Sequence, residues 1–192
     1  MSKPARSTLH RDAWLRKALD VLFSQGIGNV KVETLARELS VTKGSFYWHF
    51  KNRDALLHQM VDWWRDTQRG FIDSLDVNHI TDAPHLIRSV IDFTQHTDDS
   101  RHDVAMREFA RFDAYAAAAV AEIDRCRIDY LCAVFAAAGF DAAEALLRAQ
   151  ALYFYQVGEY TTSLSMADDL RDDLAERRFR LLISHPRDEQ IG

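Results

Sequence analysis

The chain has 192 residues, a length that allows one large domain or two small ones. Hydrophobic residues make up 47% of it and charged residues 28%, a globular composition that argues against disorder as the main state. Seven glycines and three prolines are too few for the turns of an all-β sandwich, and two cysteines are too few for a disulfide scaffold. We expect a cytoplasmic protein with no membrane contact, because the chain lacks both an apolar run of about 18 residues and the apolar core of a signal peptide.

The net charge of −5 is unevenly divided along the chain. Residues 1–58 hold ten lysines and arginines against five acids, whereas the rest holds 14 arginines, no lysine and 24 acids. A basic segment joined to an acidic body favours contact of the first 60 residues or so with a polyanion. Chance variation in local composition would give the same division, so charge alone leaves the partner open.

Apolar residues recur at intervals of three and four along nearly the whole chain, which is the pattern of amphipathic helices. The expected helices cover residues 8–25, 32–39, 42–50, 52–70, 84–97, 101–112, 114–138, 142–165 and 168–184. We expect Gly26 and Gly139 to end the helices before them, and the side chains of Thr42, Asn52 and Asp141 to cap the helices after them. Because no strand pattern competes, the sequence predicts an all-α fold of about nine helices.

The second and third expected helices are short and are joined by three or four residues, which is the spacing of a helix-turn-helix. The second helix of such a pair lies in the major groove of DNA. In this chain that helix begins with Lys43 and small polar residues, while Phe46 and Phe50 are spaced to anchor it on the helix before it. Arg53 then stands at the start of the next helix, where a phosphate would meet both a cation and a helix N-terminus.

The DNA-binding segment of the tetracycline-repressor (TetR) family is similar to residues 32–57, VETLARELSVTKGSFYWHFKNRDALL. The resemblance rests on a small residue followed by Phe-Tyr-x-His-Phe, then a basic residue and Ala-Leu-Leu, and it extends over residues 9–58. It implies a three-helix helix-turn-helix DNA-binding domain at residues 1–58. It further implies that residues 59–192 form a helical domain for ligand binding and dimerisation.

The resemblance also implies roles for the residues in and beside the second helix of the motif. The residues that match base-reading positions are Lys43, Gly44 and Ser45. The residues that match phosphate-contacting positions are Thr42, Tyr47, His49 and Arg53, and Trp48 matches a position that can do either.

Alternatives and departures from the family pattern remain at five positions. Tyr47 and Trp48 could pack against the first helix instead, and His49 could be a surface histidine without a role. Lys31 stands where the family often has a capping threonine, and a lysine cannot cap. Ser40 stands where the family often has glycine, so it would be mildly strained if its φ is positive.

The resemblance places a dimer interface and a ligand pocket in the second domain. One helix-turn-helix makes too few contacts for specificity, so such proteins bind palindromic sites as dimers. The interface residues expected from the last two long helices are Leu146, Ala149, Tyr153, Phe154, Val157, Gly158, Thr161, Leu164, Leu174 and Leu181. The expected pocket residues are Trp63, Trp64, Phe71, Phe93, Arg107, Phe109, Phe112, Tyr130 and Tyr155. The alternative for both sets is packing within one chain, with Arg107 paired to Glu108, Asp103 or another acid rather than to a ligand.

The sequence therefore predicts a ligand-responsive transcriptional regulator, a repressor, that binds a palindromic double-stranded DNA operator as a homodimer. A small apolar or aromatic effector would release it from DNA. The alternative is a helical protein-interaction module without DNA binding. We expect no enzyme, metal or cofactor, because no Gly-rich phosphate loop, metal cluster or Ser–His–Asp spacing is visible.

Overall fold

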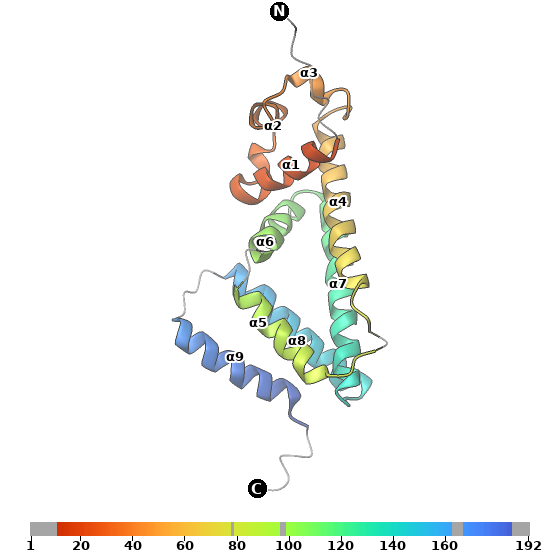
Figure 1. The fold of residues 1–192 in the computed structure, drawn as a ribbon, viewed down its shortest axis with the longest axis vertical. Coiled ribbons are helices and arrows are strands. Elements are labelled where there is room, and N and C mark those ends of the chain that lie inside the picture. Colours follow the sequence, from red (N-terminus) through yellow and green to blue (C-terminus); the bar gives the residue numbers. More distant parts are fainter. Residues whose placement is uncertain (1–10, 78, 97–98, 163–166, 186–192) are drawn as a thin grey trace, which may run out of the picture. The chain divides into compact units, whose positions relative to one another are not determined.

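The computed structural model describes residues 11–77, 79–96, 99–162 and 167–185 (Figure 1). Those residues form helices and no strand. The helices are α1 (Arg11–Gln25), the short 3-10 helix η1 (Ile27–Asn29), α2 (Val32–Glu38), α3 (Lys43–Phe46), α4 (Arg53–Asp73), α5 (Ala83–His96), α6 (Asp99–Ala110), α7 (Ala114–Ala137), α8 (Ala142–Thr161) and α9 (Asp168–Ile183). The predicted all-α fold of about nine helices is confirmed. The largest differences from the predicted bounds are the early ends of α3, which gives way to turn residues after Phe46, and of α8 at Thr161.

The chain folds into two compact units. The first comprises Met1–Gln68 and Ala105–Ala121, and the second comprises Arg69–Val104 and Glu122–Gly192. Three of the helices, α4, α6 and α7, supply residues to both units. The first unit therefore holds the expected DNA-binding domain, residues 1–58, together with further helical residues. The functional boundary after residue 58 stays a prediction.

A tightly packed aromatic pair forms the centre of the first unit. Trp14 of α1 and Phe46 of α3 are fully buried and meet edge to face with ring centroids 5.4 Å apart. Phe46 also stacks on Phe50 at 5.3 Å, and Leu35 of α2 and Met60 of α4 are buried in the same unit. Burying each such side chain contributes about 1.5–3 kcal/mol. Phe46 and Phe50 are thus buried, as anchors of α3 must be, and Phe46 packs on Trp14 of α1; their predicted packing on α2 stays a prediction.

Two of the three predicted side-chain caps are present. The carboxamide of Asn52 accepts a backbone hydrogen bond from the first turn of α4 at 2.8 Å, and the carboxylate of Asp141 accepts two from α8 at 3.0 Å. The predicted cap by Thr42 is wrong, because its side chain makes no capping hydrogen bond. The Ser45 N–H, which such a cap would bind, donates instead to the backbone oxygen of Thr42 at 3.0 Å. A single tight turn thus satisfies this donor without the hydroxyl.

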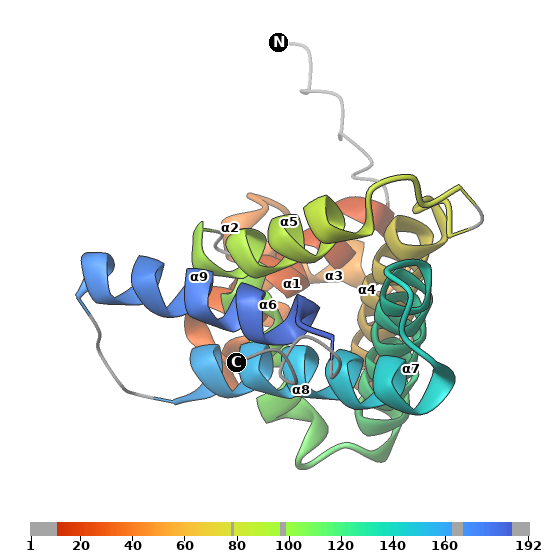
Figure 2. The same ribbon diagram turned by 90° about the horizontal axis from the view of Figure 1, so that it is seen from below.

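The core of the second unit is apolar and draws on α5, α7, α8 and α9. Its fully buried side chains include Ile87, Ile91, Val134, Phe135 and Leu152. Within this unit α5 contacts both α8 and α9 (Figure 2). This packing leaves the remaining sides of α8 and α9 available for other contacts.

Arg148 of α8 holds the C-terminal end of α9. Its guanidinium donates to the backbone oxygens of Leu181 at 3.1 Å and Leu182 at 2.8 Å, and it lies 4.1 Å above the ring of Phe140. The last carbonyls of a helix have no partner within the helix and carry partial negative charge. Arg148 therefore satisfies two of these acceptors and fixes the register between α8 and α9.

Candidate nucleic-acid interface

The turn between α2 and α3 gives the motif its geometry. Ser40 takes a left-handed conformation with φ of 55°, and the next residue, Val41, donates its N–H to the oxygen of Ala36 at 2.9 Å. Among the described residues, the other positive φ values are those of Gly26 (77°) and Gly139 (96°), which end α1 and α7 as predicted. The positive φ considered for Ser40 is thus confirmed. For a residue with a Cβ it costs about 1–2 kcal/mol, which the rest of the motif must offset.

Residues 43–50, which comprise α3 and the turn after it, are divided between a buried and an exposed side. Phe46 and Phe50 are buried, whereas Tyr47 is 64% and Trp48 is 87% exposed. The alternative that Trp48 packs against α1 is therefore wrong. Of the other residues predicted to meet DNA, Thr42, Lys43 and Gly44 are exposed and Ser45, His49 and Arg53 are partly buried. The core thus holds α3 so that its polar and aromatic side chains face solvent.

Lys43, the first residue of α3, is paired with an acid on the neighbouring helix. Its ammonium nitrogen lies 2.7 Å from a carboxylate oxygen of Glu33 in the first turn of α2. Both side chains are well exposed, at 59% and 61%. The pKa of the Glu33 carboxyl is lowered below its ordinary value. The hydrogen bond from Lys43 is the largest cause, and a backbone hydrogen bond and the charge of Lys43 are smaller ones. The sequence analysis missed this pair, whose residues stand ten apart on different helices.

Arg53 joins the start of α4 to the segment after α1. Its Nε donates to the backbone oxygen of Val30 at 2.7 Å, and its Nη2 donates to that of Ile27 at 2.9 Å. The side chain is therefore ordered within the protein itself. Its contact with a DNA phosphate stays a prediction. The guanidinium that would make this contact also stabilises the fold through its two hydrogen bonds to backbone oxygens.

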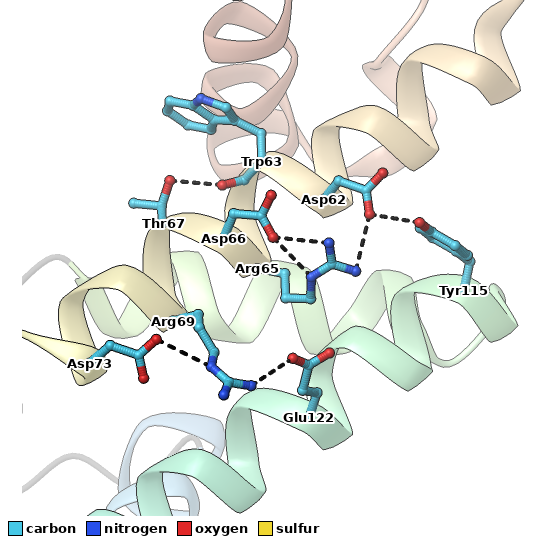
Figure 3. Close-up of polar contacts among 9 residues, drawn as sticks. All are labelled: Asp62, Trp63, Arg65, Asp66, Thr67, Arg69, Asp73, Tyr115 and Glu122. Carbon is cyan, nitrogen blue, oxygen red and sulfur yellow. Dashed lines mark hydrogen bonds and ion pairs between the residues drawn. The ribbon is translucent and has the colours of Figure 1, made fainter.

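Ion pairs and hydrogen bonds connect α4 to α7 within each unit (Figure 3). In the first unit the hydroxyl of Tyr115 donates to Asp62 at 2.6 Å, and Asp62 also pairs with Arg65 at 3.2 Å. In the second unit Arg69 pairs with Glu122 at 3.1 Å. The hydrogen bond to Asp62 raises the pKa of Tyr115, with burial and the charge of Asp62 adding to it. The two contacts between α4 and α7 were not predicted, because each joins residues that are 53 apart in the sequence.

A polar cluster lies among the apolar side chains of the second unit. Nη1 of Arg127 donates to both carboxylate oxygens of Asp103, at 3.0 and 2.9 Å, and Asp103 also accepts from the hydroxyl of Tyr160 at 2.9 Å. The hydroxyl of Tyr153 donates to Asp124 at 2.7 Å and accepts from Arg127 at 3.4 Å. Burial lowers the pKa of Arg127, but the charge and hydrogen bond of Asp103 outweigh it, so the net pKa is raised. Arg127 is therefore a partly buried cation, paired with an acid, that the sequence analysis missed.

The predicted pocket residues are divided between the two units. Those in the first unit are Trp63, Trp64, Arg107, Phe109 and Phe112, and those in the second are Phe71, Phe93, Tyr130 and Tyr155. Trp64 and Phe109 are buried, whereas Phe71 is 60% and Phe112 is 84% exposed. The side chain of Phe93 lies outside the described residues. The structure does not bring this set together within one unit, and the pocket stays a prediction.

Two of these predicted pocket residues have defined surroundings in the second unit. The ring of Tyr155 lies 3.4 Å below the guanidinium carbon of Arg178, which also pairs with Glu159 at 3.7 Å. Tyr130 is partly buried against the apolar core, and burial raises its pKa. Both tyrosines thus contribute to packing within one chain.

Arg107 of the first unit is partly buried at the end of α6, and Asp103, one of its expected partners, pairs with Arg127.

An apolar stripe runs along the exposed side of α8. Leu147, Ala151 and Phe154 are exposed, and Gly158 follows at the same helical spacing with open space where a Cβ would stand. On α9, Leu170 and Leu181 are exposed as well. The sequence analysis missed Leu147 and Leu170, although the spacing of 147, 151, 154 and 158 could have indicated the stripe.

The residues predicted for the dimer interface fall on more than one side of α8 and α9. Ala149 and Tyr153 are buried within the protomer, so they offer no free surface. The predicted residues that are exposed or partly buried are Leu146, Phe154, Val157, Gly158, Thr161, Leu174 and Leu181. Leu164 lies outside the described residues. The interface stays a prediction, carried by the exposed members of the set.

No group of three or more His, Cys, Asp or Glu side chains is placed to hold a metal ion within the described part of the chain. No described helix is both long and apolar enough to span a membrane.

An outward-facing α3 fixed by a buried aromatic core defines a helix-turn-helix protein of the all-α class. Residues 15–60 match the family of bacterial regulatory proteins described as the tetR family. Tetracycline repressor protein class C from Escherichia coli is 29% identical over 154 residues, which are 78% of this chain and 64% of that repressor, less than two thirds of its length. The chain is therefore similar to the tetR family through residues 15–60 and through this repressor.

Solved structures share the fold of nearly the whole chain. A TetR transcriptional regulator from Legionella pneumophila aligns with a TM-score of 0.71 at 15% identity, covering 96% of this chain and 99% of that one. The regulator FadR from Bacillus subtilis, solved in complex with stearoyl-CoA, aligns with a TM-score of 0.59 at 18% identity, covering 91% and 98%. At these identities the likeness establishes the fold alone.

Proposed function

We propose that the chain is a transcriptional regulator whose α3 enters the major groove of an operator. The observation that carries this proposal is the division of residues 43–50, which comprise α3 and the turn after it: Phe46 and Phe50 are buried, while Lys43, Tyr47 and Trp48 are exposed. The major groove admits one α-helix and presents a distinct pattern of donors and acceptors for each base pair. The excess of cations over acids in residues 1–58 supports the same surface.

Salt dependence of DNA binding tests this proposal. Fluorescence anisotropy of a labelled duplex should show affinity that falls steeply between 50 and 200 mM salt, because bound cations displace counterions from the phosphates. A helical module that binds only protein would show no such dependence. Binding that is absent at 50 mM salt would refute the proposal.

Lys43 and Arg53 are proposed to act differently on DNA. Lys43→Ala should lose about 1–3 kcal/mol of discrimination at one base pair, because a base contact carries sequence information. Arg53→Ala should weaken all sequences alike and reduce the salt slope by about 1. It also removes two hydrogen bonds to backbone oxygens, so its DNA affinity must be compared at a temperature where circular dichroism shows the variant folded. Equal weakening of operator and random DNA by Lys43→Ala would contradict base reading by that residue.

We further propose that two copies pair through the exposed sides of α8 and α9. Supporting this are the apolar stripe of Leu147, Ala151 and Phe154 and the exposed Leu170 and Leu181. Contiguous exposed apolar surface on a soluble protein commonly marks an interface. Sedimentation equilibrium should give twice the mass of one chain at micromolar concentration, and a monomer there would contradict the pairing.

The regulator is proposed to be a repressor that a small apolar or aromatic effector releases from DNA. The effector would bind within the helical second domain, where the polar cluster around Arg127 could orient one polar group of a mainly apolar ligand. Release requires that the effector bind the DNA-free conformation more tightly than the DNA-bound one. By reciprocity, operator DNA must weaken effector binding by the same factor. A compound that binds equally well with and without operator is therefore not the effector.

A further inference from the structure

The inference concerns the acid that faces the proposed base-reading lysine. Glu33 and Lys43 come from the first turns of α2 and α3, and their charged atoms are 2.7 Å apart. Both lie in the same compact unit and both are exposed to solvent. The free protein therefore does not present Lys43 as an isolated cation but as one half of an ion pair.

The Glu33 carboxyl carries its charge in the free protein. Its pKa is lowered mainly by the hydrogen bond from Lys43, and the charge of Lys31 makes a smaller contribution. At neutral pH the carboxylate is therefore ionised. It cancels the charge of Lys43 locally and stands as an anion beside a surface that meets phosphates.

An exposed ion pair of this kind is easily exchanged for a better partner. Pairs of exposed side chains are weak, because water screens the charges and the side chains lose freedom. A good bidentate base contact is stronger, and it discriminates between base pairs by about 5- to 150-fold. Lys43 can thus leave Glu33 for a matching base edge.

We propose that Glu33 is a specificity-determining residue, which holds Lys43 away from the phosphates of non-cognate DNA and yields it to a matching base. This inference rests on the proposed DNA-binding function and adds a second residue to its base-reading site. Specificity is a difference between two affinities. A group that weakens binding to the wrong DNA therefore raises specificity, just as a group that strengthens binding to the right DNA does.

The test compares two charge-equivalent variants on random and selected duplex DNA. E33Q removes the anion beside Lys43, whereas E38Q removes an anion from the same helix that faces Lys17 at 3.9 Å and Gln25 at 3.3 Å. For E33Q on random DNA we expect the slope of log affinity against log salt to steepen by about 0.9, for one more cation free to neutralise a phosphate. Between 50 and 200 mM salt that slope adds about a 3.5-fold change in affinity. E38Q should change the slope less.

The ratio of affinities for selected and random DNA provides the second readout. E33Q should lower this ratio, and in a Lys43→Met background the same substitution should no longer affect the salt slope. Equal effects of E33Q and E38Q, or an unchanged slope for E33Q, would overturn the role of Glu33 while leaving DNA binding intact. A wild-type chain that binds no DNA in a salt-dependent way would overturn the proposed function, and this inference with it.

Discussion

Gly44→Ala separates the needs of the fold from the needs of the proposed interface. Gly44 is exposed on α3 and does not have a positive φ, and a Cβ built on it meets only the hydroxyl of Thr42, at an ordinary contact distance of 3.7 Å. Within a helix alanine is favoured over glycine by about 0.5–1 kcal/mol. The variant should therefore be as stable as the wild type or more stable by up to about that amount. A backbone that approaches DNA closely at Gly44, however, leaves no room for the added methyl group.

Two assays on the same samples decide this prediction. Thermal unfolding followed by circular dichroism should show an unchanged or raised midpoint for Gly44→Ala. Anisotropy with operator DNA should show weaker binding by about tenfold or more, which corresponds to about 1.4 kcal/mol or more. Undiminished operator affinity in a stable variant would refute the close approach of α3 at this residue. A lowered melting temperature would refute the reasoning from the free space around the glycine.

Three further predictions concern the rest of the chain. Phe154→Glu places a charge in the apolar stripe of α8 and should convert a dimer to a monomer in sedimentation at micromolar concentration; an unchanged dimer would place the interface elsewhere. Asp103→Asn should lower the free energy of unfolding in urea by about 1.5–3 kcal/mol, the range for hydrogen bonds to charged groups, because Arg127 loses its carboxylate; no loss would show that the pair is dispensable. The pKa of Tyr115 is raised in the folded protein, so its hydrogen bond to Asp62 stabilises the fold below the unfolded-state pKa of about 10. This contribution to stability is lost as the pH rises through the folded-state pKa. Tyr115→Phe should therefore lose stability at pH 8 and less of it at high pH, and an equal loss at both would contradict that assignment.

The helices were predictable because local signals fix them. Regular apolar spacing located each helix, and Asn52 and Asp141 supplied the caps that their sequence positions indicated. Thr42 failed as a cap because the N–H that it would bind has a nearer partner in the backbone of a one-turn helix. The anchoring of α3 by Phe46 was predictable for the same reason as the helices, since residues four apart share a helix face.

The pairs that link distant helices were not predictable from one sequence. Asp103 and Arg127 are 24 residues apart, and nothing in their spacing distinguishes them from other acids and arginines of the acidic body. The dimer interface shows a related difficulty. Because α8 carries apolar residues on several sides, the sequence could not tell that Tyr153 packs inside the protomer while Phe154 faces solvent. Trp48 likewise could have packed inward or faced DNA until its exposure was known.

Selection of DNA fragments from a random library by the 192-residue chain tests the central claim most directly. A dimer that presents two copies of α3 to successive major grooves should enrich an inverted repeat whose half-sites lie about 10–10.5 base pairs apart, centre to centre, or a multiple of that spacing. Binding to the enriched sequence should weaken steeply with salt and should exceed binding to random DNA by at least about 10³-fold. A library that shows no enrichment, or enriched sequences without two-fold symmetry, would contradict recognition of an operator by paired α3 helices.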